Sequence, residues 1–246
     1  MSYLIVGASS GLGRELAYVF AENKKNLCLI SRDERDLNTI KSDLKEKFFN
    51  EVEVLNLDFS KENEIKDKLL SNKNLIEKLE GVLFPIGLMF DHDDIHLSSE
   101  SVNKLNSANY LSVCLTISEL IKIKKDKEFL IVGFGSVSGL LGRNINSYYA
   151  AAKRALETYF ESLIFNNKKN NFNIHFYTLG YLNTGLAFGK DLKLPKGEVK
   201  KLARTVFKNK NKKIIMKYFP SFWKIISLIL RLLPLGVLLK FKSFIK

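Results

Sequence analysis

Cysteine and proline are scarce in this 246-residue chain, which contains two cysteines and four prolines. Two cysteines cannot build the disulfide framework of a small secreted domain, so we expect a reducing, cytoplasmic setting. Four prolines and 14 glycines exclude collagen-like and low-complexity chains, and 46% hydrophobic residues exclude a disordered chain. Met1, Ser2 and Tyr3 lead directly into an apolar segment, which predicts no secretory signal. The length suits one sizeable domain.

Acidic residues are scarce in one part of the chain only. The whole chain carries 39 Lys and Arg against 26 Asp and Glu, a net charge of +13. Residues 190–246 contain 16 basic and 2 acidic residues, which leaves 23 basic and 24 acidic residues in residues 1–189. Residues 1–189 are therefore close to neutral. The excess positive charge lies in residues 190–246, and a proposed function must explain why it is concentrated there.

Short apolar segments alternate with longer amphipathic segments, which is typical of a parallel sheet covered by helices. Strands are predicted at residues 3–6, 27–31, 52–57, 81–86, 129–134, 172–178 and 213–216. Helices are predicted at residues 12–23, 34–48, 62–70, 102–124, 147–166 and 198–209. We therefore predict an α/β fold with a doubly wound, mostly parallel, Rossmann-type sheet of about seven strands over residues 1–217. A basic, amphipathic helical appendage is predicted over residues 218–246.

A glycine-rich turn follows the first predicted strand and opens the first predicted helix. Glycines at such a place allow a tight turn, close approach of the backbone to a pyrophosphate, and close packing of helix on strand. The helix N-terminus adds free N–H groups and a favourable dipole for phosphate. A turn with a purely structural role is the alternative. The residues predicted to contact a dinucleotide here are Gly7, Ser9, Ser10, Gly11, Leu12 and Gly13.

A tyrosine and a lysine lie four residues apart in the predicted helix 147–166. Tyr149 and Lys153 therefore share one face of that helix. A phenol with a pKa of about 10 transfers protons poorly at neutral pH, and a nearby ammonium group favours the phenolate. Ser136 lies 13 residues before Tyr149, just after the predicted strand 129–134.

The G-x-x-x-G-x-G spacing, the Y-x-x-x-K pattern and the upstream serine resemble the short-chain dehydrogenase/reductase family, from residue 3 to about residue 216. The resemblance implies that Tyr149 is the general acid/base and that Ser136 orients and polarises a substrate carbonyl. It implies that Lys153 lowers the pKa of the tyrosine and holds the nicotinamide ribose. Asn106 matches the asparagine that supports a water relay to the lysine.

The end of the second predicted strand indicates the cofactor. An acidic residue there would bind the ribose hydroxyls of NAD, but this chain has Ser31 and Arg32. A guanidinium forms charge-assisted hydrogen bonds to a 2′-phosphate, so we expect NADP(H); an exposed arginine beginning a helix is the alternative. By resemblance, Asp58 contacts the adenine.

Two later motifs of the family are only partly present. Gly87 alone survives of the N-N-A-G that usually follows the fourth strand, because Phe84, Pro85 and Ile86 replace the other three residues. Gly180 and Thr184 match the P-G-x-x-x-T motif that binds the nicotinamide carboxamide, while Leu179 replaces its proline. The resemblance adds Gly87, Gly180 and Thr184 to the predicted cofactor site.

No metal site is predicted. His92 and His96 lie in a polar connection that we interpret as a solvated loop, and His175 lies in a predicted strand.

The apolar C-terminal segment is interrupted by charges, and its longest charge-free stretch after Lys224 is residues 232–239. This stretch is too short to span a bilayer, which takes about 20 residues. The polar residues form one stripe at helical spacing: Lys217, Ser221, Lys224, Ser227 and Arg231. We therefore predict a helix lying in a membrane interface, with packing on the body or on a second subunit as the alternative. Nucleic acid is excluded as a partner because it would leave the wide apolar face unexplained.

Together these features predict an NADP(H)-dependent oxidoreductase of the cytoplasmic membrane face that acts on a carbonyl or secondary alcohol. The tail resembles that of reductases acting on polyprenyl-phosphate-linked keto-sugars, while fatty-acyl, retinoid and steroid-like substrates fit an interfacial enzyme equally well. A catalytically weak, nucleotide-binding membrane scaffold is the alternative function. A homodimer or homotetramer is left open.

Overall fold

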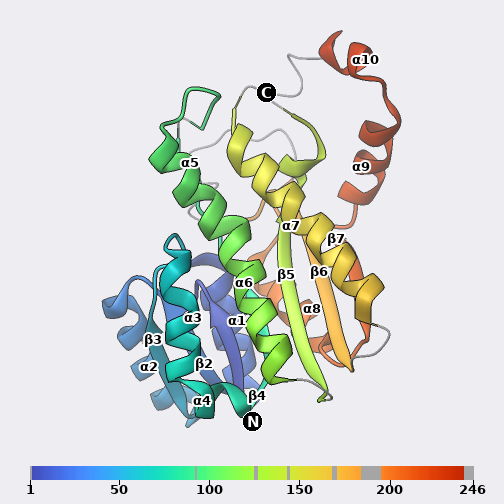
Figure 1. Cartoon of the computed structure of the whole chain (residues 1–246). Helices are drawn as coiled ribbons and strands as arrows, with labels where there is room; N and C mark the ends of the chain where they lie inside the picture. Colours follow the sequence, from blue (N-terminus) through green and yellow to red (C-terminus); the bar gives the residue numbers. More distant parts are fainter. Residues whose placement is uncertain are drawn as a thin grey trace.

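The computed structural model describes residues 2–91, 93–124, 127–142, 145–167, 171–183 and 195–240, without the side chains of residues 66, 235 and 239. Its centre is one sheet whose strands are β1 (Ser2–Val6), β2 (Asn26–Ser31), β3 (Val52–Asn56), β4 (Leu79–Phe84), β5 (Phe129–Ser136), β6 (Phe172–Leu179) and β7 (Ile214–Phe219). All neighbouring strands pair in parallel, in the order β3-β2-β1-β4-β5-β6-β7 (Figure 1). The predicted doubly wound parallel sheet is confirmed.

Helices cover both faces of this sheet. They are α1 (Gly11–Glu22), α2 (Glu34–Phe48), α3 (Glu62–Ser71), α4 (Lys73–Glu77), α5 (Ser99–Asn106), α6 (Ser112–Ile123), α7 (Ser147–Asn166), α8 (Val199–Asn209), α9 (Trp223–Leu232) and α10 (Leu235–Lys240). On one face α1, α2 and α8 bury Leu16, Leu37 and Leu202 in a single cluster. On the other, α6 and α7 bury Ile117 and Phe160 in a second cluster, together with α3 and α4. Strand β5 is apolar at successive positions because both of its faces are buried, whereas the equally buried β6 also contains Asn173, His175 and Thr178.

The prediction of one continuous helix at residues 102–124 is wrong, because the structure has two α-helices there. A π-helical segment, Ser107–Leu111, separates α5 from α6. Such segments insert an extra residue into a helix and shift the side chains that follow. A short 3-10 helix, Val137–Leu140, follows β5, and the five-residue α4 was not predicted.

The C-terminal appendage contains two helices in its described part. Strand β7 continues to Phe219, so Lys217 lies in the sheet and not in the predicted helix. Helix α9 begins at Trp223, three residues after Pro220, and Pro234 separates α9 from α10, as its missing N–H and fixed φ favour. None of the helices in the described ranges combines the length and apolar character needed to cross a membrane.

The strand order reverses beside β1. The chain proceeds outward from β1 through β2 to β3, and then crosses back to place β4 on the other side of β1. In open parallel sheets, ligands bind at such a reversal, beyond the carboxyl ends of the strands. We therefore expect a ligand-binding site at the segments that follow β1 and β4.

Candidate functional site

A cleft of about 850 Å³ opens at this reversal point, at the carboxyl ends of the strands. It brings together most of the predicted site residues. The predicted residues that line it are Gly7, Ser9, Ser10, Gly11, Leu12, Ser31, Arg32, Asp58, Gly87, Ser136, Tyr149, Lys153 and Gly180. Gly13 and Asn106 do not line it, and Thr184 lies outside the described residues.

The glycine-rich turn forms one wall of the cleft. Gly7 has a φ of +84°, a conformation that L side chains rarely adopt, and its N–H donates to the Ile30 carbonyl at 2.8 Å. A Cβ on Gly13 would lie 2.0 Å from the carbonyl oxygen of Gly7. Gly13 therefore acts behind the cleft, where it allows α1 to pack against the turn.

The end of β2 is tied to this turn by a side-chain contact. The Ser31 hydroxyl donates to Ser9 Oγ at 2.9 Å, and Ser31 Oγ accepts from the backbone N–H of Asp33 at 3.2 Å. Arg32, the next residue, is exposed and lines the cleft. Asp58, which follows β3, accepts from the N–H of Ser60 at 2.9 Å and also lines the cleft.

Helix α7 carries both the tyrosine and the lysine into the cleft. Lys153 is buried, and its Nζ donates to the carbonyl oxygens of Ile86 at 3.0 Å and Phe134 at 3.2 Å. Burial lowers the pKa of Lys153 to about 8. The ammonium nitrogen lies 5.9 Å from the centre of the Tyr149 ring. Ser136 ends β5 on the same cleft, and its Oγ accepts from the N–H of Ser138 at 3.1 Å.

Asp93, in the connection that the sequence predicts to be a solvated loop, holds the start of α7. Asp93 is buried, and its carboxylate accepts from the backbone N–H of Tyr148 at 2.9 Å and of Tyr149 at 2.8 Å. Its carbonyl accepts from the N–H of Ser147 at 3.2 Å. The first N–H groups of a helix have no partner within the helix, and a carboxylate there is favoured by the dipole. No local pattern could reveal this contact, because Asp93 and Tyr149 are 56 residues apart.

A second residue that was missed is Asn109, in the π-helical segment. Its side chain is buried; it accepts from the N–H of Leu88 at 3.1 Å and donates to the carbonyl of Leu88 at 2.8 Å. It also donates to the carbonyl of Leu105 at 2.9 Å. Asn109 therefore braces the segment after β4, where the family's N-N-A-G is mostly replaced. Asn106 lies three residues earlier, half-buried at the end of α5.

One signal in the sequence pointed to Asn109. In the predicted helix, it lies four residues from both Leu105 and Val113, on the apolar stripe. A buried amide must find hydrogen-bond partners, so that position predicts a specific bracing contact.

The two histidines within the described ranges lie in different parts of the fold. His96 is exposed, the ring of buried His175 contacts the Lys212 carbonyl at 2.6 Å, and His92 lies outside the described residues. Within the described ranges, no group of three or more His, Cys, Asp or Glu residues could hold a metal ion.

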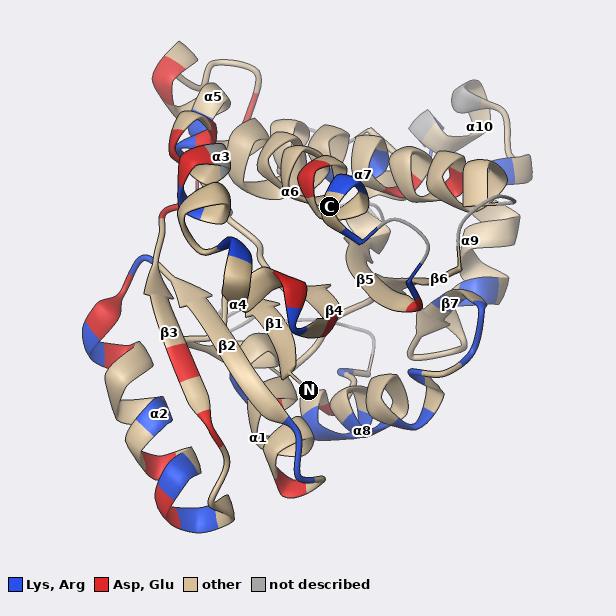
Figure 2. Ribbon diagram, turned by 60° about the horizontal axis from the view of Figure 1, so that its bottom comes forward, with Lys and Arg blue, Asp and Glu red and all other residues tan. Residues whose placement is uncertain are grey.

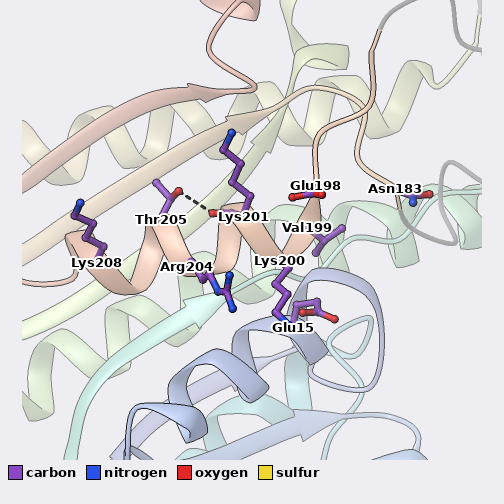
Figure 3. Close-up of a pocket in the computed structure, with 9 residues that line it drawn as sticks. All are labelled: Glu15, Asn183, Glu198, Val199, Lys200, Lys201, Arg204, Thr205 and Lys208. Atoms are coloured by element: carbon purple, nitrogen blue, oxygen red, sulfur yellow. Dashed lines mark hydrogen bonds between the residues drawn. The ribbon is translucent and has the colours of Figure 1, made fainter.

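A second hollow, of about 580 Å³, lies between α1 and α8 (Figure 3). Its cationic residues are Lys200, Lys201, Arg204 and Lys208, and Glu15 and Glu198 lie among them. Lys and Arg gather along α8 and its connection to β7 (Figure 2). The hollow shares none of the predicted catalytic or cofactor residues, so the cleft beside β1 and β4 is the candidate site.

Comparisons with known proteins agree with this geometry. The sequence profile of the family described as short chain dehydrogenase matches residues 2–193. The chain is 30% identical over 189 residues to the dehydrogenase/reductase SDR family protein 7-like of Anopheles gambiae, covering 75% of this chain and 60% of that protein. It is 28% identical over 166 residues to the very-long-chain 3-oxoacyl-CoA reductase of Mus musculus, covering 65% of this chain and 52% of that protein. The chain thus spans little more than half the length of these relatives.

Solved structures share the fold. A short-chain dehydrogenase from Sphingobium yanoikuyae, in complex with NADPH, has a TM-score of 0.76 at 19% identity, covering 92% of this chain and 91% of that one. Levodione reductase has a TM-score of 0.77 at 20% identity, covering 87% of this chain and 94% of that one. Since the family profile covers most of the sequence and the sheet has the matching architecture, the chain belongs to the short-chain dehydrogenase/reductase family.

Proposed function

We propose that this chain is an NADP(H)-dependent oxidoreductase that transfers a hydride between nicotinamide and a carbonyl or secondary alcohol. The observation that carries the proposal is the convergence of Ser136, Tyr149 and Lys153 on the same cleft as the glycine-rich turn. Proton-transfer groups and a dinucleotide-binding turn in one cleft are what such a reaction requires.

The residues of the cleft fit a dinucleotide. Gly7 and Gly13 leave no side chain between the turn and α1, and the cleft is large. Gly11 and the N-terminus of α1 would hold the pyrophosphate, and Asp58 the adenine end. When bound, the nicotinamide would supply or accept the hydride. Gly87 and Gly180 line the cleft beside Tyr149 and would border the nicotinamide.

The proton would move at the hydroxyl of Tyr149. In reduction, this hydroxyl would donate its proton to the substrate carbonyl oxygen as the adjoining carbon gains the hydride; oxidation would reverse both steps. The Lys153 ammonium would favour the phenolate that remains, because an opposite charge lowers a phenol's pKa. The Ser136 hydroxyl would donate a hydrogen bond to the same substrate oxygen. Asn109 would steady this region, since it holds the backbone of Leu88, two residues after Lys153's partner Ile86. The water-relay role that the resemblance gives Asn106 stays a prediction.

The preference for NADP(H) over NAD(H) is supported by Arg32. This exposed guanidinium lines the cleft at the end of β2, where it could form charge-assisted hydrogen bonds to a 2′-phosphate. The structural relative from Sphingobium yanoikuyae was solved with NADPH.

The substrate we propose is a lipid-linked sugar or another membrane-associated carbonyl compound, met at the surface of a membrane. The basic, apolar C-terminal segment supports this location. Two similar proteins are named very-long-chain 3-oxoacyl-CoA reductase and 11-beta-hydroxysteroid dehydrogenase B, both names of enzymes for lipid-like substrates.

The test is turnover of NADPH with a panel of soluble ketones, long-chain 3-oxoacyl esters and lipid-linked keto-sugars. Tyr149→Phe, which keeps the ring and removes the proton, should abolish turnover while NADPH still binds. Deuterium from labelled NADPH should appear on the product carbon. Tight NADPH binding with no turnover of any substrate would favour the alternative function, a nucleotide-binding scaffold.

A further inference from the structure

Helix α9 presents an apolar face to the outside of the protein. Ile225, Leu228, Ile229 and Leu232 are between 52% and 74% exposed. Their spacing of three, four and seven residues from the first places them on one side of the helix, and we call them the apolar ridge. A contiguous exposed apolar surface is a common feature of docking sites.

The opposite face of α9 is fastened to the catalytic domain. Trp223 and Ser227 are 6% and 4% exposed, and Arg231 Nη2 donates to Glu157 Oε1 on α7 at 3.0 Å. A Cβ on Gly180 would lie 1.9 Å from the Trp223 indole nitrogen, so the ring rests directly on that glycine. The helix therefore buries Ser227, directs the Arg231 side chain to Glu157 and leaves the four residues of the apolar ridge outward, the reverse of a helix on a water-facing surface.

This orientation is fixed by contacts on two different elements. Rotating α9 to bury the apolar ridge would break the Arg231–Glu157 ion pair, which is shared with Arg154 at 3.1 Å, and would lift Trp223 off Gly180. Glu157 is buried, so losing a cationic partner would leave its charge poorly compensated. The exposed ridge is thus the arrangement that the rest of the protein imposes.

We propose that the apolar ridge is the surface by which this protein docks onto an anionic lipid bilayer, with α9 lying in the plane of the interface. Helix α9 has ten residues, a length of about 15 Å at 1.5 Å per residue, which suits a helix that lies on a membrane. The proposal rests on the proposed function in one respect: it specifies how the cleft would meet a membrane-associated substrate.

The positive charge around the apolar ridge favours an anionic bilayer over a second copy of the chain as the surface that covers the ridge. Residues 195–240 contain 12 Lys and Arg but a single acidic residue, Glu198. Lys217, Lys224 and Lys240 are exposed at the end of β7, on α9 and at the end of α10. Two such surfaces face to face would bring like charges together, whereas anionic headgroups would neutralise them while the acyl region receives the ridge.

Trp223 connects α9 to the candidate site. Trp223 begins α9, and its ring lies 5.8 Å from that of Tyr181, which lines the cleft next to Gly180. A bilayer bound to α9 would therefore lie beside the Gly180 end of the cleft. A substrate anchored in that bilayer would have a short path to Tyr149.

The experiment measures co-sedimentation of the full chain with vesicles of phosphatidylcholine alone and with added phosphatidylglycerol. The test variant is the double substitution Leu228→Ser with Ile229→Ser, whose side chains point away from the protein. Phe165→Ser is its control, because Phe165 is an exposed apolar residue on α7, away from the ridge. We expect wild type and Phe165→Ser to bind anionic vesicles alike, and the double variant to bind at least about tenfold more weakly.

A second pair of variants separates the contribution of α9 from that of α8. Lys224→Glu should weaken binding to anionic vesicles and leave the weak binding to neutral vesicles unchanged, whereas Lys201→Glu on α8 should have a smaller effect. Turnover of a soluble ketone should be the same in all four variants. Vesicle binding without turnover in wild type would overturn the proposed function and leave the docking surface standing.

Two results would overturn the docking proposal. One is equal vesicle binding by wild type and the double variant. The other is a wild-type chain that ignores vesicles and sediments as a dimer that the double variant dissociates, since the ridge would then be an interface between copies.

Discussion

The buried carboxylate of Asp93 accepts a hydrogen bond from the backbone N–H of Tyr149 at 2.8 Å, so the proposed proton donor is fixed through its own main chain. The other carboxylate oxygen accepts from Tyr148, which makes the pair of contacts bidentate. This arrangement holds the first turn of α7 against the loop that follows β4. The side chain of Tyr149 therefore leaves the helix from a position that both elements determine.

Asp93→Asn should disturb the start of α7. The amide can still accept from one backbone N–H, but its NH2 group faces the other, so one helix donor loses its partner. We expect a loss of about 1–2 kcal/mol in the free energy of unfolding, and turnover that falls more than NADPH affinity. Urea denaturation and steady-state kinetics measure both. The matched control is Asp94→Asn, whose carboxylate accepts only the N–H of His96 among its described contacts; equal effects of the two variants would contradict the positioning role.

Asn109 and Asn106 should differ sharply when each is replaced by alanine. Asn109→Ala removes the partner of the half-buried N–H and carbonyl of Leu88 and of the buried Leu105 carbonyl, which should cost about 2–4 kcal/mol of unfolding free energy. Asn106→Ala, at a half-buried position, should change stability by less than about 1 kcal/mol. Thermal denaturation of the two variants decides which asparagine braces the site. A larger effect at Asn106 would contradict the bracing role of Asn109.

Most of the fold was predictable because it depends on local patterns. The helices Glu34–Phe48 and Ser147–Asn166 begin and end where the sequence predicts, since apolar spacing and flanking polar residues determine both ends. The break at Ser107–Leu111 was not predictable in this way. The segment contains Asn109, whose side chain contacts Leu88, 21 residues away, and no helical pattern contains such a contact.

In the candidate site, too, the local features were predictable and the long-range contacts were not. The glycine-rich turn and the Tyr149–Lys153 spacing are local features, and the structure places their residues on one cleft, while their chemical roles stay predictions. Asp93 was missed because its partners lie on α7, far along the chain. The tail's amphipathic character was evident in the sequence, but which face turns inward depends on Glu157 and Gly180, outside the tail.

Arg32→Ala should weaken NADPH far more than NADH. A charge-assisted hydrogen bond to a phosphate contributes about 1.5–3 kcal/mol, which corresponds to about ten- to a hundredfold in affinity. Fluorescence titration with each cofactor measures the two changes. Arg35→Ala is the control, because Arg35 is exposed on α2 and does not line the cleft. An equal weakening of both cofactors in Arg32→Ala would mean that this side chain contacts the adenine rather than a 2′-phosphate.

Lys153→Met should change how stability depends on pH. Burial lowers the pKa of Lys153 to about 8, from 10.5 as the ordinary value. Below about pH 8 the lysine is charged in both the folded and the unfolded chain, so the full cost of burying the charge opposes folding. As the pH rises toward about 10.5, the folded chain has already lost this proton while the unfolded chain still holds it, and the cost is progressively relieved.

Methionine is never charged, so the variant lacks this pH-dependent cost, although it leaves the carbonyls of Ile86 and Phe134 unpaired at every pH. The unfolding free energy of wild type should therefore rise relative to Lys153→Met by about 2 kcal/mol between about pH 8 and about pH 9.5. Urea denaturation at several pH values, without cofactor, measures this difference directly. Groups that do not contact Lys153, such as Cys28, whose thiol pKa is raised by burial, contribute equally in both proteins, so their contribution cancels. Lys68→Met, at an exposed position on α3, is the control and should show no such change relative to wild type; a flat difference for Lys153→Met would mean that Lys153 keeps its proton in the folded protein throughout this range.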